Sequence, residues 1–371
     1  MLQTRILLSK RYSRRFRYFL KLPTKIQPTL RKLEKEIQKT PNYLIPFYSC
    51  PICRCKKSTV VSEISRFNLP MEIQVCEYCG LIFNVGHFSN EFMLKYYKYY
   101  FYLIRRPGSK RKKLLGHIKE NSNAWKRKEF IKKHLGEKYN DLKIVVEVGC
   151  GDGGNLYPFF CEGMRTFGCD LDEGAINQGK RLGLELYIGD INCLIDKGIR
   201  SSLIILPHVL AHISDLNDFL EKIFKIINPK GFLYIESDGI FSELKAGIKK
   251  HNNLLWYFQF DFIMCFELRT LSYLLNKNGF NLEYGDESIK SIFSLQHKKN
   301  ESPIDFIGEV SDNKGEVLKT IYEIEKNYLK QGLLKTLYRQ LKGIYHFIKN
   351  ITIFSIIDCL SFLGFNNKPL E

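Results

Sequence analysis

Two pairs of cysteines near the start of the chain have the spacing of a metal site. Cys50 and Cys53 form one Cys-x-x-Cys pair, and Cys76 and Cys79 form a second. Each pair can direct two thiolates at one ion, and four thiolates make a closed tetrahedral zinc site. Cys55 is close enough to compete, but the paired spacing favours the other four. The sequence therefore predicts a structural zinc ion, because four protein ligands leave no position open for a substrate.

A glycine-rich turn follows an apolar run in the middle of the chain. Residues 149–154 read Gly-Cys-Gly-Asp-Gly-Gly, and glycines allow a sharp turn and close approach to a ligand. Glu147 lies two residues before the turn, where its carboxylate would repel a pyrophosphate but attract an ammonium or sulfonium group. The spacing Gly149-x-Gly151-x-x-Gly154 also fits a dinucleotide fingerprint, so a nicotinamide-dependent oxidoreductase is an alternative.

Two more carboxylates follow the next two apolar runs. Asp170 ends the run 166–170, and Asp190 follows the run 184–189. A carboxylate at the end of a second strand can accept hydrogen bonds from both ribose hydroxyls, and Asp190 could reach an adenine amino group. Together with Glu147, these acids favour a cationic adenosine ligand such as S-adenosylmethionine.

Short apolar runs alternate with helical stretches over this part of the chain. The expected strands are 143–149, 166–170, 184–189, 202–207 and 232–236, and the expected helices are 154–163, 173–182, 214–227 and 267–278. Such alternation predicts an α/β domain with a parallel sheet covered on both faces. Residues 281–284 and 292–296 could close the sheet as an antiparallel pair, and 123–136 is expected to be an amphipathic helix.

At these residues the sequence resembles the class I S-adenosylmethionine-dependent methyltransferases. Glu147-x-Gly149-x-Gly151-x-Gly153 looks like their first motif, and 206–213 and 226–232 are similar to their fourth-strand segment and the turn before strand five. The resemblance covers roughly residues 120–298 and implies a Rossmann-like, seven-stranded, mostly parallel sheet. The cofactor-binding residues that it implies are Glu147, Gly149, Gly151, Gly153, Asp170, Leu171, Asp190 and Ile191.

The catalytic base is less well marked by the sequence. His208 stands where the fourth strand of this family opens onto the reacting methyl group, and a histidine there could act as a general base or as a wall of the site. His212 could act in the same way or face the following helix. His251, Asp238 and Glu236 are further candidates, since Asp238 follows the fifth strand at the expected rim.

A cysteine block followed by such a domain resembles the methyltransferases of deoxysugar, O-antigen and capsule pathways. Their carbon-methylating members carry a Tyr-His-Glu-His run shortly before a Phe-Ser-x-x-x-Leu segment, which residues 266–271 resemble. The preceding residues 259–262, Gln-Phe-Asp-Phe, lack both histidines. The resemblance therefore implies methyl transfer to a hydroxyl group of a nucleotide-sugar or glycan, which requires one base and correct positioning.

The net charge of +18 indicates an anionic partner. The residues 1–40 form a basic arm, and the basic amphipathic stretch 326–349 could lie on an anionic membrane surface or pack on protein, including a second subunit of a homodimer. No apolar run reaches the roughly 20 residues that cross a bilayer, and the sparse cysteines favour a reducing compartment. We therefore expect a cytoplasmic protein, with attachment to the inner face of the membrane as a further option.

The expected divisions of the chain are a basic N-terminal arm (1–45), a zinc-binding ribbon (46–90), a linker and helix (91–120), the α/β domain (121–298) and a basic helical C-terminal extension (299–371). Two other functions stay open. The tyrosine cluster 96–102 and the basic ends could bind RNA, which would suit an RNA or protein methyltransferase. Alternatively, Ala211 replaces an acid that the family usually carries, so the domain could bind cofactor without catalysis.

Overall fold

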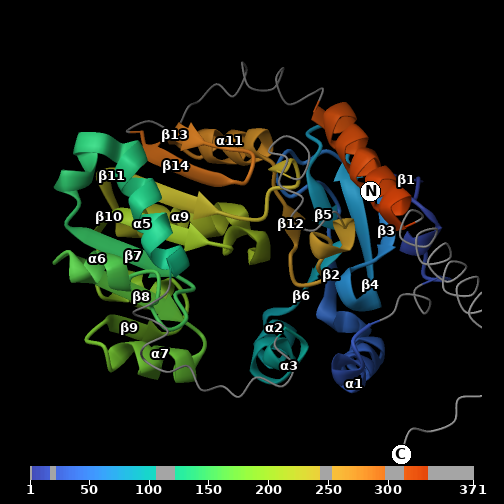
Figure 1. Ribbon diagram of the computed structural model, residues 1–371, viewed down its shortest axis with the longest axis horizontal. Helices are drawn as coiled ribbons and strands as arrows, with labels where there is room; N and C mark the ends of the chain where they lie inside the picture. Colours follow the sequence, from blue (N-terminus) through green and yellow to red (C-terminus); the bar gives the residue numbers. More distant parts are fainter. Residues whose placement is uncertain (1, 17–21, 106–121, 243–252, 297–312, 333–371) are drawn as a thin grey trace, which may run out of the picture.

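The computed structural model describes residues 2–16, 22–105, 122–242, 253–296 and 313–332. The described residues leave out 106–120 of the expected linker and helix, the candidate base His251, and most of the stretch 326–349. The described chain has two large sheets and a two-stranded one of β2 (Leu44–Pro46) and β6 (Gly86–Phe88). Figure 1 shows the largest sheet beside the second, which holds the N-terminal strands.

The larger sheet has the strand order β13-β14-β11-β10-β7-β8-β9. The neighbouring pairs from β11 to β9 are parallel, whereas β14 lies antiparallel between β11 and β13. These strands fall close to the runs expected from the sequence: β7 (Ile144–Val148), β8 (Arg165–Asp170), β9 (Glu185–Ile188), β10 (Ser201–Pro207), β11 (Ile227–Glu236), β13 (Phe280–Gly285) and β14 (Lys290–Leu295).

Both faces of this sheet are covered because apolar side chains fill both sides of its strands. In β10, Leu203 and Ile205 join one apolar cluster, while Ile204 and Leu206 join another, as the two-residue period of a strand requires. The first cluster contains residues of α5 (Ser122–Leu135), α6 (Tyr157–Cys161) and α7 (Glu173–Lys180). The second contains residues of α8 (Asn192–Asp196), α9 (Leu216–Ile226) and α11 (Leu268–Lys277).

The strand order fixes where a ligand can bind. The chain runs outward from β7 in one direction to β9 and in the other direction from β10, so the order reverses between β7 and β10. In open α/β sheets, ligands bind at such a reversal, beyond the carboxyl ends of the strands. The antiparallel β14 between β11 and β13 departs from the strand order of dinucleotide-binding sheets, which weighs against the oxidoreductase alternative.

The smaller sheet joins parts of the chain that are far apart in sequence. Its order is β1-β3-β4-β5-β12, with β1 (Leu2–Arg5), β3 (Lys57–Ile64), β4 (Pro70–Cys76), β5 (Ile82–Asn84) and β12 (Met264–Cys265). Because β12 follows β11 in the chain, the ribbon and the α/β domain share a sheet. The N-terminal arm is also part of this unit, since β1 pairs with β3 and Tyr12 is fully buried.

A helix over residues 313–332 packs on the ribbon. Its inward residues Val317, Ile321 and Ile324 are fully buried, at the spacing of one helix face. Near its end, the buried carboxylate of Glu325 accepts hydrogen bonds from Arg11 Nη2 at 2.6 Å and from the Tyr12 hydroxyl at 2.7 Å. Among the described residues, no helix combines the length and the hydropathy that crossing a bilayer requires.

Replacing Glu325 with glutamine should destabilise the protein strongly. The Arg11 and Glu325 side chains are only 11% and 2% exposed, and removing one partner of a buried ion pair costs about 3 kcal/mol. The free energy of unfolding, measured by urea denaturation, should fall by that order. Arg5→Gln is the matched control, because Arg5 is 51% exposed in its pair with Glu72 and such pairs contribute less than about 1 kcal/mol. Equal losses in both variants would contradict this account.

Candidate active site and metal centre

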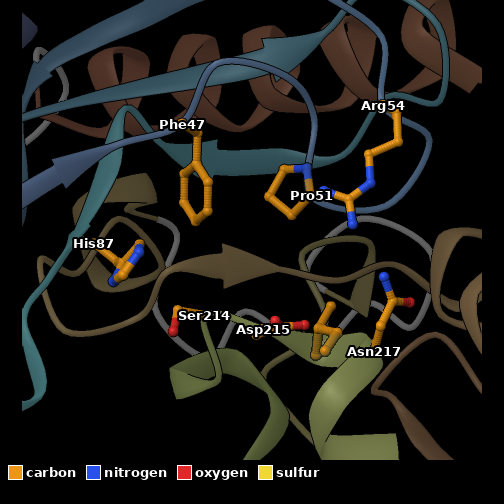
Figure 2. Close-up of a pocket in the computed structure, with 8 residues that line it drawn as sticks. Phe47, Pro51, Arg54, His87, Ser214, Asp215 and Asn217 are labelled. Atoms are coloured by element: carbon orange, nitrogen blue, oxygen red, sulfur yellow. The ribbon is translucent and has the colours of Figure 1, made fainter.

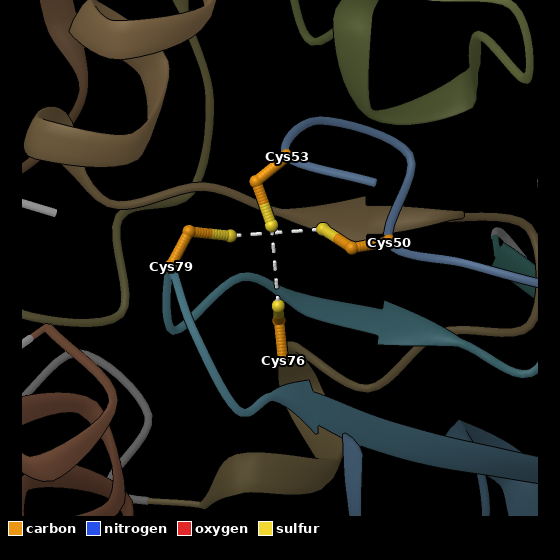
Figure 3. Close-up of side chains that lie close together, drawn as sticks. All are labelled: Cys50, Cys53, Cys76 and Cys79. Atoms are coloured by element: carbon orange, nitrogen blue, oxygen red, sulfur yellow. Dashed lines mark hydrogen bonds between the residues drawn. The ribbon is translucent and has the colours of Figure 1, made fainter. Parts of the chain in front are cut away.

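The four cysteines of the two pairs meet beside the smaller sheet. Their Sγ atoms all lie within 4.8 Å of one another, and Figure 3 shows them converging on one point. Cys50 Sγ lies 3.6 Å from Cys79 Sγ, and Cys53 Sγ lies 3.5 Å from Cys76 Sγ. Zinc–sulfur bonds of about 2.3 Å place tetrahedral sulfur atoms roughly 3.8 Å apart. The four positions therefore fit a zinc ion.

The electrostatics of this cluster also favour a cation. Hydrogen bonds from the three neighbouring thiols hold the pKa of Cys76 far below its usual range. Burial raises the pKa of Cys50, and hydrogen bonds with the other cysteines raise that of Cys79. One thiolate is thus stable alone, but four would repel one another unless a divalent ion compensates their charge. With four protein ligands, a zinc ion here would be structural.

The glycine loop after β7 has the backbone form that its sequence predicts. Gly149, Gly151 and Gly153 have φ values of 71°, 55° and 72°, a region that strains residues with a Cβ atom. A Cβ on Gly149 would lie 3.1 Å from Val209 Cγ2, whereas one on Gly151 would meet no described atom within 4 Å. The loop therefore packs against the segment after β10 but leaves open space at Gly151 for a ligand.

Glu147 is a buried carboxyl group with one oxygen unused. Its side chain accepts a hydrogen bond from Asn155 Nδ2 at 2.6 Å through Oε1, while Oε2 has no hydrogen-bond partner among the described residues. The residue is 1% exposed, and burial raises its pKa to about 8. An unpaired buried polar atom is costly, so a ligand ammonium group, as in S-adenosylmethionine, would satisfy it.

An arginine of α5 orders the groups around Glu147. Arg127 Nε donates to Glu236 Oε2 at 2.7 Å, and Arg127 Nη1 donates to Asn155 Oδ1 at 2.5 Å. The Tyr234 hydroxyl donates to the same Glu236 oxygen at 2.7 Å. Burial would raise the pKa of Glu236, but the hydrogen bond and charge of Arg127 hold it below its ordinary value. Glu236 is therefore an ionised anchor at the end of β11.

Asp170 ties the glycine loop to the end of β8. Its Oδ2 accepts a hydrogen bond from the Gly151 amide and its Oδ1 accepts one from the Asp172 amide, both at 2.8 Å. Each carboxylate oxygen has a second lone pair, and the residue is half-buried. Asp170 can therefore hold the loop and still accept hydrogen bonds from ribose hydroxyls.

The remaining predicted cofactor residues lie at the next two strand ends. Leu171 is 54% exposed and Ile191 is buried, so Leu171 has apolar surface free to cover an adenine face. Asp190 is exposed, and its carboxylate accepts hydrogen bonds from the Asn192 amide at 3.0 Å and from Asn192 Nδ2 at 3.1 Å. It therefore fixes the start of α8, and a contact with adenine would use its remaining lone pairs.

Two of the predicted catalytic residues, His208 and Asp238, lie in the described part of the chain. His208 is 42% exposed, and its Nε2 lies 4.0 Å from Glu236 Oε1, while its backbone φ of 57° is unusual for a histidine. Asp238 is half-buried after β11. Burial raises the pKa of Cys265 to about 12, and the charge of Asp238 adds to this shift. The described residues therefore place Asp238 toward β12, while His208 contacts Glu236 at the sheet edge.

His212 has close polar neighbours that fix its ring. It ends the short helix η8 (Leu210–His212) after β10, and its Nδ1 lies 2.7 Å from the Asp261 carbonyl oxygen. A carbonyl oxygen can only accept, so Nδ1 of the neutral ring carries the hydrogen. The Tyr97 hydroxyl lies 3.0 Å from the same nitrogen, and the Phe262 ring packs edge-on at 4.7 Å. Nε2 therefore keeps its lone pair, and it makes no hydrogen bond within the described chain.

The tyrosine cluster is partly buried. Tyr96 and Tyr100 are buried, and Tyr97 begins a π-helix (Tyr97–Phe101), a form often found at functional sites. Behind it, Arg105 Nη2 donates to Asp261 Oδ1 at 3.0 Å. Tyr99, by contrast, is 54% exposed, so RNA binding stays a prediction. Within the cluster, the Tyr97 hydroxyl contacts His212 Nδ1.

Sequence reasoning missed Arg127, Tyr97 and Asp261 as residues of the site. The helical period predicted the helix that carries Arg127, but its partners Glu236 and Asn155 lie far along the chain. No local spacing links such residues. Tyr97 could have been noticed only as one of several tyrosines.

Comparison with known proteins adds an independent finding. Residues 110–284 match a family model described as a methyltransferase domain. This part of the chain is therefore similar to a methyltransferase domain. The acids, the glycine loop and the strand order of the methyltransferase domain agree with the resemblance to the class I, S-adenosylmethionine-dependent type. No curated protein sequence matches the chain.

Several solved structures are similar to the methyltransferase domain. An S-adenosylmethionine-dependent methyltransferase from Methanosarcina mazei is 14% identical, with a TM-score of 0.34, over 46% of this chain and 98% of that one. The plantazolicin methyltransferase in complex with SAH is 15% identical, with a TM-score of 0.36, over 56% of this chain and 83% of that one. Human N-acetylserotonin methyltransferase in complex with SAM is 14% identical, with a TM-score of 0.39, over 50% of this chain and 56% of that one.

Cys53→Ser should remove the metal. The purified protein should contain about one zinc ion per chain, and the variant should lose it because three thiolates bind zinc far more weakly. Its melting temperature should fall, since Cys50, Cys76 and Cys79 belong to the apolar cluster of the large sheet. Cys55→Ser is the matched control, because Cys55 Sγ bonds the Lys57 amide at 3.4 Å instead. Metal analysis by mass spectrometry would contradict the assignment if Cys53→Ser kept its zinc.

Binding of S-adenosylhomocysteine should release protons. Because the pKa of Glu147 is raised to about 8, the free carboxyl is mostly protonated at pH 7. A ligand ammonium group would ionise it and release about 0.9 proton per ligand. Calorimetric titration in buffers of different ionisation enthalpy measures this number. Glu147→Gln should release none and bind roughly 10- to 100-fold more weakly, and proton release that persists in the variant would contradict the role of Glu147.

Proposed function

We propose that the protein transfers a methyl group from S-adenosylmethionine to a hydroxyl group of a sugar, in a nucleotide-sugar or a glycan. The observation that carries the proposal is the lone pair of His212 Nε2, held next to the segment that packs on the glycine loop. Val209 makes this contact with the loop, three residues before His212. A base thus adjoins the expected position of the reacting methyl group.

The reaction needs such a base. S-adenosylmethionine, when bound, supplies an electrophilic methyl group on a sulfonium. The attacking hydroxyl must lose its proton as it reacts, and a side chain within hydrogen-bond reach can accept that proton. His212 is suited to this, because the Asp261 carbonyl fixes its tautomer and burial lowers its pKa. The ring is therefore neutral at pH 7 and can accept the proton at Nε2.

The groups around His212 also affect the choice of acceptor atom. Where carbon-methylating relatives carry two histidines, this chain has Phe260 and Phe262. Phe260 is buried against Tyr96, with ring centroids 4.6 Å apart, and Asp261 is paired with Arg105. Besides His212, this wall of the described site offers no base that could deprotonate a carbon next to a carbonyl group. A hydroxyl acceptor, which needs one base, is therefore favoured.

The charge of the site fits a neutral reacting group. The pKa of Tyr97 is raised, first by burial and then by the charges of Asp261 and Asp170. The phenol therefore stays protonated and leaves His212 as the group that can take a proton. A sugar hydroxyl brings no charge into this buried region, whereas a phosphate would lie close to Asp170.

His212→Asn should reduce methyl transfer by roughly 100-fold or more. Asparagine can still donate to the Asp261 carbonyl but has no equivalent of Nε2, so folding and S-adenosylhomocysteine binding should persist. The assay measures S-adenosylhomocysteine released with a panel of nucleotide-sugars and neutral oligosaccharides as acceptors. His208→Asn is the matched control, and its 42% exposed side chain should change the rate little.

The pH profile separates a base from a merely structural residue. Since His212 must be neutral to act, activity should be full above its pKa and fall as the pH drops through it. That limb should lie below the ordinary imidazole value of 6.5, because burial lowers the pKa. An acidic limb that survives in His212→Asn, or a larger loss in His208→Asn, would overturn the assignment.

A further inference from the structure

A cavity of about 310 Å³ opens between the zinc ribbon and the start of α9, a volume in the range of small-ligand sites. It lies apart from the cofactor residues, because none of its lining residues belongs to the glycine loop or to the strand ends that carry Asp170 and Asp190. Figure 2 shows the ribbon residues on one side of it and the start of α9 on the other. The lining residues are Phe47, Pro51, Arg54, His87, Ser214, Asp215, Leu216 and Asn217.

One side of the cavity is apolar and flat. Phe47 is half-buried and points into the space in Figure 2. Its ring is held edge-on by Phe83 at 6.2 Å and lies 5.3 Å from the His87 ring. A fixed aromatic ring of this kind offers its face to a ligand at little cost in conformational entropy.

Both sides of the cavity also present polar groups with unused donors or acceptors. The Arg54 guanidinium has no hydrogen bond or ion pair within the described chain, and its backbone φ is 63°. His87 Nδ1 bonds the Phe88 carbonyl at 3.2 Å, which leaves Nε2 as an acceptor. Asp215 Oδ1 accepts from the Asp218 amide at 3.1 Å, which leaves Oδ2 free. Donors and acceptors thus alternate around the apolar face.

We propose that this cavity binds a sugar ring of the acceptor; the inference rests on the proposed function. A sugar ring has an apolar face of C–H groups and a rim of hydroxyls that both donate and accept. Phe47 suits the face, and Arg54, Asp215 and Asn217 suit the rim. A phosphate is disfavoured, because Asp215 would place a carboxylate against it.

The cavity also lies at the right distance from the chemistry. Ser214, in its wall, is two residues after His212, and consecutive Cα atoms are 3.8 Å apart, so their Cα atoms are at most about 7.6 Å apart. A ring bound here is next to the base without occupying the cofactor site. This favours an acceptor with more than one ring, that is, a glycan, in which one ring is held while a neighbouring hydroxyl reacts.

Ligand-observed NMR by saturation transfer tests this inference. The full-length, zinc-loaded protein saturated with S-adenosylhomocysteine is mixed with glucose, galactose, mannose, rhamnose, N-acetylglucosamine and the trisaccharide maltotriose. At least one should show saturation of its ring C–H protons. Phe47→Ala and Asn217→Ala should each weaken that binding about tenfold or more, whereas Lys56→Ala, an exposed residue of the same turn that does not line the cavity, should not.

Each other outcome has a defined meaning. Zinc content and the melting temperature show whether Phe47→Ala is folded, and Asn217, exposed on the opposite wall, gives an independent reading. No transfer to any of these sugars, or binding of UMP or inorganic phosphate that Arg54→Ala abolishes, would overturn the sugar-ring proposal while leaving the methyltransferase assignment intact. Failure to bind S-adenosylhomocysteine would instead overturn the proposed function.

Discussion

The hydrogen bonds of one segment, residues 259–265, hold the two sheets and the active site in register. The Ile263 amide donates to the Ala211 carbonyl at 2.7 Å, and the Ile263 carbonyl accepts from the Asn84 amide at 2.9 Å. Asn84 Nδ2 also donates to the carbonyls of Gln259 and Phe260, at 3.2 Å each. These bonds are buried and therefore sensitive to any displacement. They join η8 of the methyltransferase domain to β5 of the ribbon.

The same segment completes the site. The Asp261 carbonyl fixes the tautomer of His212, while the Asp261 carboxylate is held by Arg105. The two roles use different atoms of one residue. Because β12 follows directly and pairs with β5, the ribbon is brought against the start of α9, where the cavity forms. The four-cysteine ribbon is thus one wall of the proposed acceptor site.

Three ionisable groups have pKa values that their surroundings shift. Glu147, Cys76 and His212 each have a pKa moved by their surroundings, and each shift prepares the group for a different charge. The Glu147 carboxyl lacks a partner for one oxygen, which an ammonium can supply. Four thiolates of the cysteine cluster would repel one another, and a divalent cation can compensate their charge. The imidazole is kept neutral, which a base requires.

The sequence alone determined the elements and the local motifs. The alternation of apolar runs predicted the strands, because buried parallel strands need apolar residues on both faces. The glycines of 149–153, the acid Glu147 and the two Cys-x-x-Cys pairs were readable because their partners lie within a few residues or at a repeated spacing. Tertiary structure alone brought the proposed base together with its neighbours, since Tyr97, His212 and Asp261 are separated by long stretches of chain. It also decided that β12 joins the ribbon and that Tyr96 and Tyr100 are buried. Such contacts depend on which distant surfaces meet, and no local pattern in the chain carries that information.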